Sequence, residues 1–275
     1  MTITTNPRVP EPPTAARPTR ARPTTARPST ARGPMTPLRR AALIAGLAYI
    51  GTFLFSIPVK FGFWTDVLEN PGFVTGAGSA GGVPMGAVFE VLTALTCVAT
   101  AVALYSVAKN YSNRAALGFV TTRVMEAGLI FVGALSVLSV YTLRQDLAGT
   151  PGADPGMLAT TGNAFIAMHD WSFLLGPGLM PVLNALLIGS VMYRSRLIPR
   201  WIPTVGLLGA PLLLVATTGA LFGVWSQVSG PAALLALPIA IWEFSFGIYM
   251  TIWGFRTEAV NEVASEPAST EISET

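Results

Sequence analysis

The chain has 275 residues, of which 51% are hydrophobic and only 11% are charged, with a formal net charge of +3. A water-soluble domain carries about a quarter charged residues. A shortfall this large excludes an ordinary soluble globular protein and predicts a chain that is surrounded by lipid over much of its surface.

The two ends of the chain differ in charge from the apolar middle. Residues 1–37 are a low-complexity stretch of Arg, Pro, Thr and Ala with little to bury, so we predict a disordered tail there. Its arginines are suited to contact anionic lipid headgroups. We expect no nucleic-acid binding, because no aromatic residues interleave with the arginines. Residues 257–275 are predicted to form a short acidic tail.

Between the tails lie six apolar stretches, each close to the roughly 20 residues that cross about 30 Å of hydrocarbon as a helix. They cover residues 41–59, 85–108, 115–143, 171–192, 202–224 and 232–255. Lipid offers no hydrogen-bond partner to free backbone groups, so we expect α-helices. The predicted fold is an all-α integral membrane bundle of about six transmembrane helices over residues 38–256, with the lipid bilayer as its main partner.

The basic residues predict the orientation of this bundle. If the N-terminal tail is cytoplasmic, Lys60 and Arg144 are the basic residues on the outer side. The inner boundaries then hold a larger basic set: Lys109, Arg114, Arg194, Arg196, Arg200 and Arg256. Cytoplasmic loops carry such an excess of Lys and Arg, so both termini are expected in the cytoplasm.

Ionisable residues inside the apolar stretches are the candidates for function, because such residues usually face the interior of a bundle. In the third stretch, Arg123 lies about 12 Å and Glu126 about 16 Å from the inner end. Glu243 lies about 16 Å from the outer end of the sixth, so all three are expected near the middle of the bilayer. Arg123 and Glu126 share a helix face, and Glu243 is placed to reach the same arginine from a facing helix.

One arginine facing two carboxylates has one excess negative charge, which a medium of low dielectric constant disfavours. The functional interpretation is a site that shares a proton, a cation or a cationic small-molecule ligand. The alternative is a structural ion-pair network that sets how the helices pack. Both interpretations remain open at the level of the sequence.

Three further residues are expected nearer the outer face: Glu90, as an additional member of the ligand or proton site, and His169 with Asp170 at an outer mouth. Imidazole and carboxylate groups bind metals. Neighbouring helical residues, however, point about 100° apart, so we predict no metal site. The single cysteine, Cys97, is predicted to be a buried thiol.

The fourth stretch is interrupted by Gly176-Pro-Gly178 and Pro181. Proline removes a helical hydrogen bond, and broken membrane helices often line a cavity; a packing kink is the alternative. No nucleotide-binding, hydrolase or metalloprotease motif occurs in the sequence. We therefore predict no catalytic residues and no cofactor.

Six short runs of sequence occur in a fixed order. They are Arg39-Arg-Ala-Ala-Leu-Ile-Ala-Gly46, Arg123-Val-Met-Glu126, Trp171-Ser-Phe-Leu-Leu-Gly-Pro-Gly178, Ser195-Arg-Leu-Ile-Pro-Arg-Trp201, Glu243-Phe-Ser-Phe-Gly247 and Trp253-Gly-Phe255. Together they resemble the bacterial multi-pass membrane family called domain of unknown function 4386, over about residues 39–255. The resemblance implies an all-helical protein of the bacterial plasma membrane without an established activity. It also implies that Arg123, Glu126 and Glu243 match recurring Arg and Glu positions.

Three hypotheses for the function follow. The favoured one is binding or proton-linked transport of a small solute through the Arg123, Glu126 and Glu243 set. The second is an intramembrane enzyme that acts on a lipid or quinone, which the outer group around His169 would serve. The third is a structural or regulatory membrane protein without catalysis. The sequence sets no oligomeric state.

Overall fold

The computed structural model describes Thr2 and residues 35–256. Within these residues the chain is helical without strands, which confirms the predicted all-α architecture. Six helical segments of the described part are long and apolar enough to cross a membrane. The tails predicted at residues 1–37 and 257–275 lie outside the described residues, apart from Thr2 and residues 35–37.

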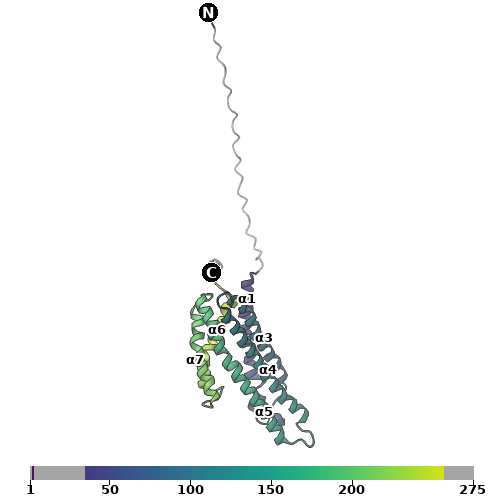
Figure 1. The fold of residues 1–275 in the computed structure, drawn as a ribbon. Coiled ribbons are helices and arrows are strands. Elements are labelled where there is room, and N and C mark those ends of the chain that lie inside the picture. Colours follow the sequence, from purple (N-terminus) through teal and green to yellow (C-terminus); the bar gives the residue numbers. More distant parts are fainter. Residues whose placement is uncertain (1, 3–34, 257–275) are drawn as a thin grey trace, which may run out of the picture. The chain divides into compact units, whose positions relative to one another are not determined.

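Figure 1 shows the helices in chain order. They are α1 (Pro37–Pro58), α2 (Thr65–Glu69), α3 (Val83–Ala108), α4 (Asn113–Leu147), α5 (Pro155–Phe173), α6 (Met180–Ser195), α7 (Trp201–Leu221) and α8 (Gly230–Ile252). Two π-helical turns extend this set: η1 (Val59–Phe63) continues α1, and η3 (Leu174–Leu179) joins α5 to α6. A 3-10 turn, η2 (Phe73–Thr75), lies in the loop before α3.

Side-chain caps determine where several of these helices begin. Oxygen atoms of Thr36, Ser112, Asp154 and Ser229 accept hydrogen bonds from backbone N–H groups in the first turns of α1, α4, α5 and α8. Such caps satisfy donors that have no partner within the helix. Proline occupies the first turn of α1, α5 and α8, where its missing N–H costs nothing.

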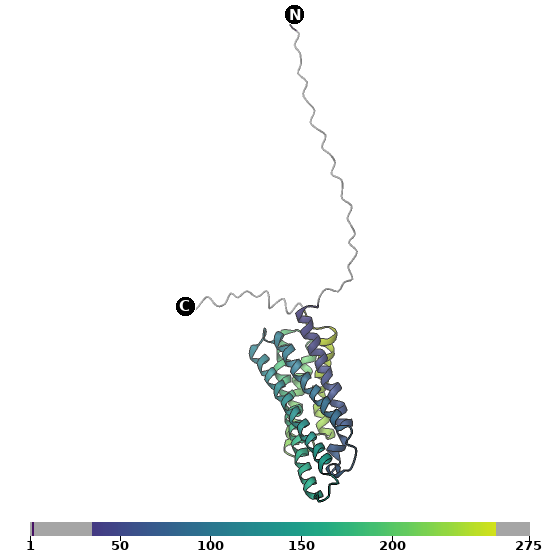
Figure 2. The same cartoon turned by 90° about the vertical axis from the view of Figure 1, so that its right-hand side faces the viewer.

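The long helices form a closed ring in which each packs against its two neighbours. The order around the ring is α1, α3, α4, α6, α7, α8 and back to α1, with α5 packed against α4. In this arrangement α4 and α8 lie on opposite sides of the ring. The first turn of α1 and the last turn of α8 lie at the same end of the bundle, where Arg39 donates hydrogen bonds to the carbonyls of Met250 and Thr251 (Figure 2).

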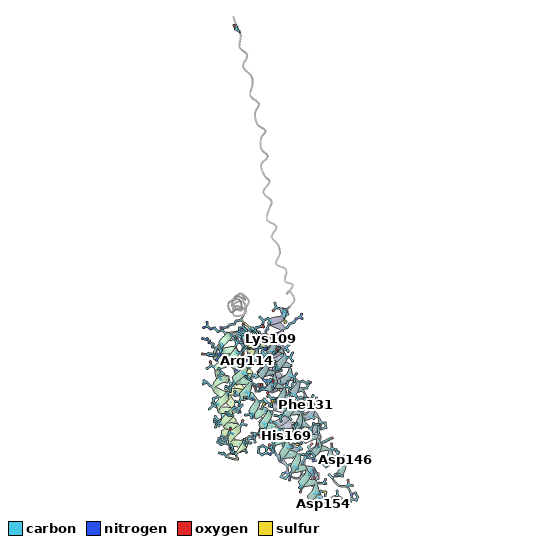
Figure 3. The ribbon with its side chains drawn as sticks, in the orientation of Figure 1. Lys109, Arg114, Phe131, Asp146, Asp154 and His169 are labelled. Atoms are coloured by element: carbon cyan, nitrogen blue, oxygen red, sulfur yellow. The ribbon has the colours of Figure 1, made fainter. Side chains whose placement is uncertain are left out.

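The fourth span is longer than the sequence predicted. It was expected at residues 171–192, whereas α5, η3 and α6 form one segment, Pro155–Ser195, of 41 residues. At 1.5 Å per residue this is about 62 Å, twice the hydrocarbon thickness. Polar residues before Trp171 hide the first half of this segment from a hydropathy criterion, yet it is helical because it packs against α4 as a hairpin. This hairpin extends past the end of α7 and carries Asp146 and Asp154 at its tip (Figures 1 and 3).

The Gly176-Pro-Gly178 sequence widens the helix without ending it, because η3 is a π turn with helix on both sides. Wide turns of this kind are common at functional sites. Gly176 allows α4 to approach closely, since a Cβ atom added there would lie 2.8 Å from the Cβ atom of Leu129. The hydroxyl of Thr217 on α7 donates to the Gly178 carbonyl at 2.9 Å, which ties the π turn to a second neighbour.

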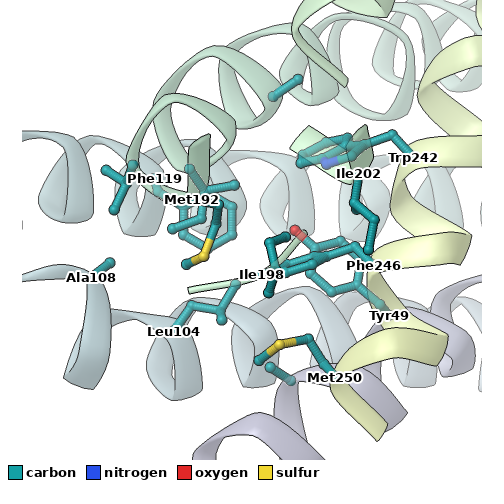
Figure 4. Close-up of a cluster of buried hydrophobic side chains, with 14 of the residues drawn as sticks. Tyr49, Leu104, Ala108, Phe119, Met192, Ile198, Ile202, Trp242, Phe246 and Met250 are labelled. Carbon is teal, nitrogen blue, oxygen red and sulfur yellow. The ribbon is translucent and has the colours of Figure 1, made fainter. Parts of the chain in front are cut away.

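An apolar cluster fills the ring at the end that holds Lys109 and Arg114 (Figures 3 and 4). Trp242 and Phe246 of α8 lie nearly parallel with ring centroids 6.2 Å apart, and Tyr49 of α1 meets Phe246 edge-on at 5.2 Å. Members contributed by other elements are Leu104, Phe119, Met192, Ile198 and Ile202. Each of these side chains is at most 1% exposed.

The contact between α1 and α8 depends on small residues. A Cβ atom added at Gly46 would lie 2.6 Å from the backbone nitrogen of Thr251 and 2.7 Å from the carbonyl oxygen of Gly247. Backbone atoms cannot move aside as a flexible side chain can, so these helices must separate to accept the substitution. Close backbone approach at small residues is a common way for membrane helices to associate.

We therefore expect Gly46→Ala to destabilise the bundle by about 1–3 kcal/mol, the usual cost of an overpacked contact. The measurement is thermal unfolding of the detergent-purified protein followed by tryptophan fluorescence. Gly128→Ala on α4 is the matched control, since an added Cβ atom there meets nothing within 4 Å. Equal melting temperatures for the two variants would contradict the proposed contact.

Candidate functional site

The Arg123 side chain lies inside the helical ring and joins two carboxylates. Its Nη1 atom lies 3.1 Å from Glu126 Oε2 on the same helix, and its Nη2 atom lies 3.2 Å from Glu243 Oε1 on α8. The residues are 0%, 4% and 8% exposed, respectively. The structure thus brings together the three residues that the sequence placed at mid-depth, and the ion pair crosses the ring from α4 to the opposite helix.

An asparagine adds a third helix to this cluster. Asn184 of α6 donates from Nδ2 to Glu126 Oε2 at 2.8 Å, and its Oδ1 atom lies 2.5 Å from the hydroxyl of Thr122. Asn184 is fully buried, so its amide has been removed from water. Asn184 was not predicted as a site residue from the sequence. An amide within an apolar stretch could have indicated it, because a buried polar group requires a hydrogen-bond partner.

Two further helices, α1 and α3, contact the guanidinium group through an aromatic ring and a thiol. The Tyr49 ring of α1 lies 4.7 Å from Arg123 Cζ, a cation–π distance, and Phe119 lies 5.8 Å away. Cys97 of α3 is fully buried, and its Sγ atom lies 3.7 Å from Arg123 Nη1. The cluster therefore draws side chains from α1, α3, α4, α6 and α8, and Cys97 contacts its central charge.

The charges of the cluster do not balance. One guanidinium group faces two carboxylates, so the ionised set has a charge of −1 in a site closed to solvent. In addition, Arg123 Nε and the Tyr49 hydroxyl are buried without a hydrogen-bond partner among the described residues. Buried charges are favourable only when they are paired and hydrogen-bonded. A cluster of this composition is chemically suited to take up one proton or one small cation.

Glu90 and His169 belong to a separate polar group closer to the far end of the bundle. Both line a small cavity of about 20 Å³ together with Ser172 and Trp64. This volume is sufficient for a water molecule. On α3, Glu90 lies about two helical turns from Cys97, and the wall of the cavity on α4 begins about one turn beyond Glu126. Glu90 therefore lines this cavity and not the Arg123 cluster, with which it was grouped from the sequence.

His169 links this cavity to the surface. The residue is 6% exposed, and its ring stacks on Phe173 and meets Trp64 edge-on. Its Nδ1 atom lies 3.1 Å from Oδ1 of Asp170, whose side chain is 60% exposed. Adjacent helical residues thus contact each other here despite their divergent directions. Figure 3 shows His169 between the basic end and the hairpin tip.

Across the described residues, no three His, Cys, Asp or Glu side chains lie close enough to hold a metal ion. The buried ionisable residues of the described part belong to the Arg123 cluster or line the Glu90–His169 cavity.

The sequence matches the model of a known protein family. The family model described as "Domain of unknown function (DUF4386)" matches residues 44–254. The chain belongs to this family. Both polar groups lie within the DUF4386 match, whereas Arg39 lies outside it. No curated protein and no solved structure matches the chain.

We expect Asn184→Leu, which has a similar volume, to destabilise the protein by about 1–3 kcal/mol because it leaves Glu126 without one of its buried donors. Thermal unfolding in detergent measures the change. Asn163→Leu on the exposed face of α5 is the matched control and should alter stability by less than about 0.5 kcal/mol. A shift of equal size in both variants would show that the amide of Asn184 contributes nothing specific.

Proposed function

We propose that this DUF4386 protein binds a small solute within the membrane and transports it together with a proton held by the Arg123 cluster. One observation carries the proposal: a single buried arginine lies between Glu126 and Glu243 on opposite sides of the ring. The excess negative charge must be neutralised, and a proton is the smallest group that can do so. Ionisable residues inside membrane bundles commonly mark such proton and ion pathways.

The second polar group supports a route for the proton from one end of the bundle. Exposed Asp170 contacts buried His169, and His169 shares a water-sized cavity with Glu90. Imidazole gains and loses protons near neutral pH, which suits it to a relay. The remaining step from the cavity to Glu126 covers about one turn of α4.

The basic end of the bundle has the opposite character. There the apolar cluster around Phe119 and Phe246 separates the Arg123 cluster from solvent. Asn184 and Thr122 are polar groups of the cluster itself, and the Glu90–His169 cavity adds further polar groups toward Asp170. In a transporter of the alternating-access type, opening of the apolar cluster would expose the same site to the other side.

We infer the orientation of the bundle in the membrane from the distribution of its basic residues. Lys109, Arg114, Arg194, Arg196 and Arg200 lie at the helix ends that share one side of the bundle. Cytoplasmic segments carry such an excess of basic residues. The proposal places this end, and with it both termini, in the cytoplasm of a bacterium, with Asp170 toward the outside.

The two alternative functions make different demands on the site. An intramembrane enzyme acting on a lipid or quinone would need substrate space that His169 itself lines, whereas the cavity that His169 lines is about 20 Å³ and accommodates water only. Larger cavities lie beside Asp170 and Phe173, and His169 is not among their lining residues. A purely structural ion-pair network would need both carboxylates for stability. The second alternative is distinguished from proton transport by changing the charges one at a time.

Neutralising one carboxylate should distinguish a proton site from a structural ion-pair network. Glu243→Gln leaves Arg123 and Glu126 as a balanced pair, so we expect an unchanged or higher melting temperature. Arg123→Gln leaves two buried carboxylates without their cation and should destabilise the protein by about 3–5 kcal/mol. A structural network predicts instead that Glu243→Gln is destabilising as well.

The proton itself can be measured by infrared difference spectroscopy of the reconstituted protein at two pH values. We expect a band of a buried protonated carboxyl group in the wild type that is absent in Glu243→Gln, because the remaining Glu126 is then balanced by Arg123. Asp146→Asn at the exposed end of α4 is the control and should keep the band.

Transport is tested in liposomes loaded with a pH-sensitive dye, to which amino acids, amines, sugars and organic acids are added singly. A solute that moves protons in the wild type and in Asp146→Asn, but not in Glu243→Gln, supports the proposal. If the infrared band is identical in all three proteins, or if Glu243→Gln only lowers stability, the proton-linked site is wrong.

A further inference from the structure

A groove on the side of the bundle adjoins the Glu90–His169 cavity and shares Phe173 and Pro177 with it. It consists of two adjoining cavities, one of about 380 Å³ and one of about 340 Å³, that share Lys60, Gln227 and four apolar lining residues. The walls come from η1, η3, α7 and the start of α8. These segments lie toward the end opposite Lys109 and Arg114, and Leu213, Ala216 and Ala232 connect the groove to the apolar cluster. The groove is therefore at the depth of one leaflet and its headgroups.

The two cavities differ in chemistry. The larger one is lined mainly by carbon, with Leu213 and Ala216 on one wall and Ala232, Ala233 and Ala236 on the other. Such a lining suits an alkyl chain, and its polar members are Ser56, Thr217, Lys60 and Gln227. At its rim, Phe61 and Val228 are 80% and 62% exposed. Large apolar side chains exposed beside an apolar cavity are typical of an entrance from the lipid phase.

The smaller cavity adds the charged groups. Glu69 and Asp170 line it together with Ser226 and Trp225, and Lys60 lies where the two cavities join. No ion pair joins Lys60 to either carboxylate within the described residues, and its ammonium group lies 5.6 Å from the centre of the Phe173 ring. The groove thus presents one cation at its middle and two anions at its polar end.

Gln227 supplies a second donor at the same junction. Its Nε2 atom is buried and has no hydrogen-bond partner in the described part of the chain. The residue lines both cavities. A buried amide without a partner is unfavourable and is rare in folded proteins, so it indicates an acceptor that completes the site. Lys60 and Gln227 together suit the oxygen atoms of a phosphate group.

We propose that this groove binds one phospholipid with a zwitterionic headgroup that carries a primary amine. An acyl chain occupies the apolar cavity, the phosphate group contacts Lys60 and Gln227, and the ammonium group lies between Glu69 and Asp170. The order of charges decides the headgroup. An anionic lipid would satisfy Lys60 but would bring no counter-charge to the two carboxylates, whereas the amine places one positive charge between them and reduces their excess from two negative charges to one. This inference is independent of the Arg123 cluster and holds whether or not a proton is transported.

Native mass spectrometry of the full-length protein tests the proposal with two probes, dioleoyl phosphatidylethanolamine and dioleoyl phosphatidylglycerol, which have the same acyl chains. We expect the ethanolamine lipid to be retained as one molecule per protein in preference to the glycerol lipid. Lys60→Gln should weaken its retention about tenfold, the effect of losing one charge-assisted hydrogen bond. Lys109→Gln at the other end of the bundle is the matched control and should bind as the wild type does.

Two further variants separate the headgroup from the chain. The double variant Glu69→Gln with Asp170→Asn should retain both lipids equally, because the counter-charge for the amine is gone. Ala233→Phe fills the apolar cavity and should reduce retention of both lipids. Equal retention of the two headgroups by the wild type overturns the proposal, since it indicates non-specific lipid around the bundle. A dimer that Lys60→Gln abolishes would also overturn it, because a second copy of the chain would then occupy the groove.

Discussion

The guanidinium group of Arg123 connects helices across the centre of the bundle. It reaches from α4 to Glu243 on α8, a helix on the opposite side of the ring, while Glu126 receives a second donor from Asn184 on α6. In lipid there is little hydrophobic driving force between helices, so close packing and buried polar contacts determine how they associate. A planar group with five donors can bind several partners at once. The ring of helices closes around this group, and its remaining cavities are arranged relative to it.

The protein is chemically different on the two sides of this cluster. Toward the basic end, Phe119, Phe246 and Met192 belong to a buried apolar cluster. Toward the other end lie Glu90 and His169 with their water-sized cavity. The cavity thus adds ionisable groups on this side of the cluster. A cavity large enough for water on this side of the cluster is compatible with the proposed proton-linked site.

The two π-helical turns shape the far half of the bundle. η3 is the wall between the Glu90–His169 cavity and the lateral groove, since Pro177 lines both, and η1 carries Lys60 at the groove. Phe173 contacts residues of both spaces, because its ring stacks on the His169 ring and also lies beneath the Lys60 ammonium group. A regular α-helix would present different side chains at these positions, because a π turn shifts the register of every residue that follows.

Composition and hydropathy determined the class of this protein, because a chain with 11% charged residues and six long apolar stretches is stable only as a helical membrane bundle. Depth along each helix also depends on the sequence alone, which is why Arg123, Glu126 and Glu243 were recognised as residues of the same level. The start of α5 was not predictable from hydropathy, since polar residues before Trp171 are helical only through their packing on α4.

Which side chains meet was decided by the tertiary structure. Lateral contacts depend on the order of helices around the ring, and nothing within one helix encodes which neighbour its inner face will meet. For this reason Asn184, Tyr49 and Cys97 joined the cluster unforeseen, Glu90 moved to a separate cavity, and the groove beside Lys60 became visible only in the assembled fold.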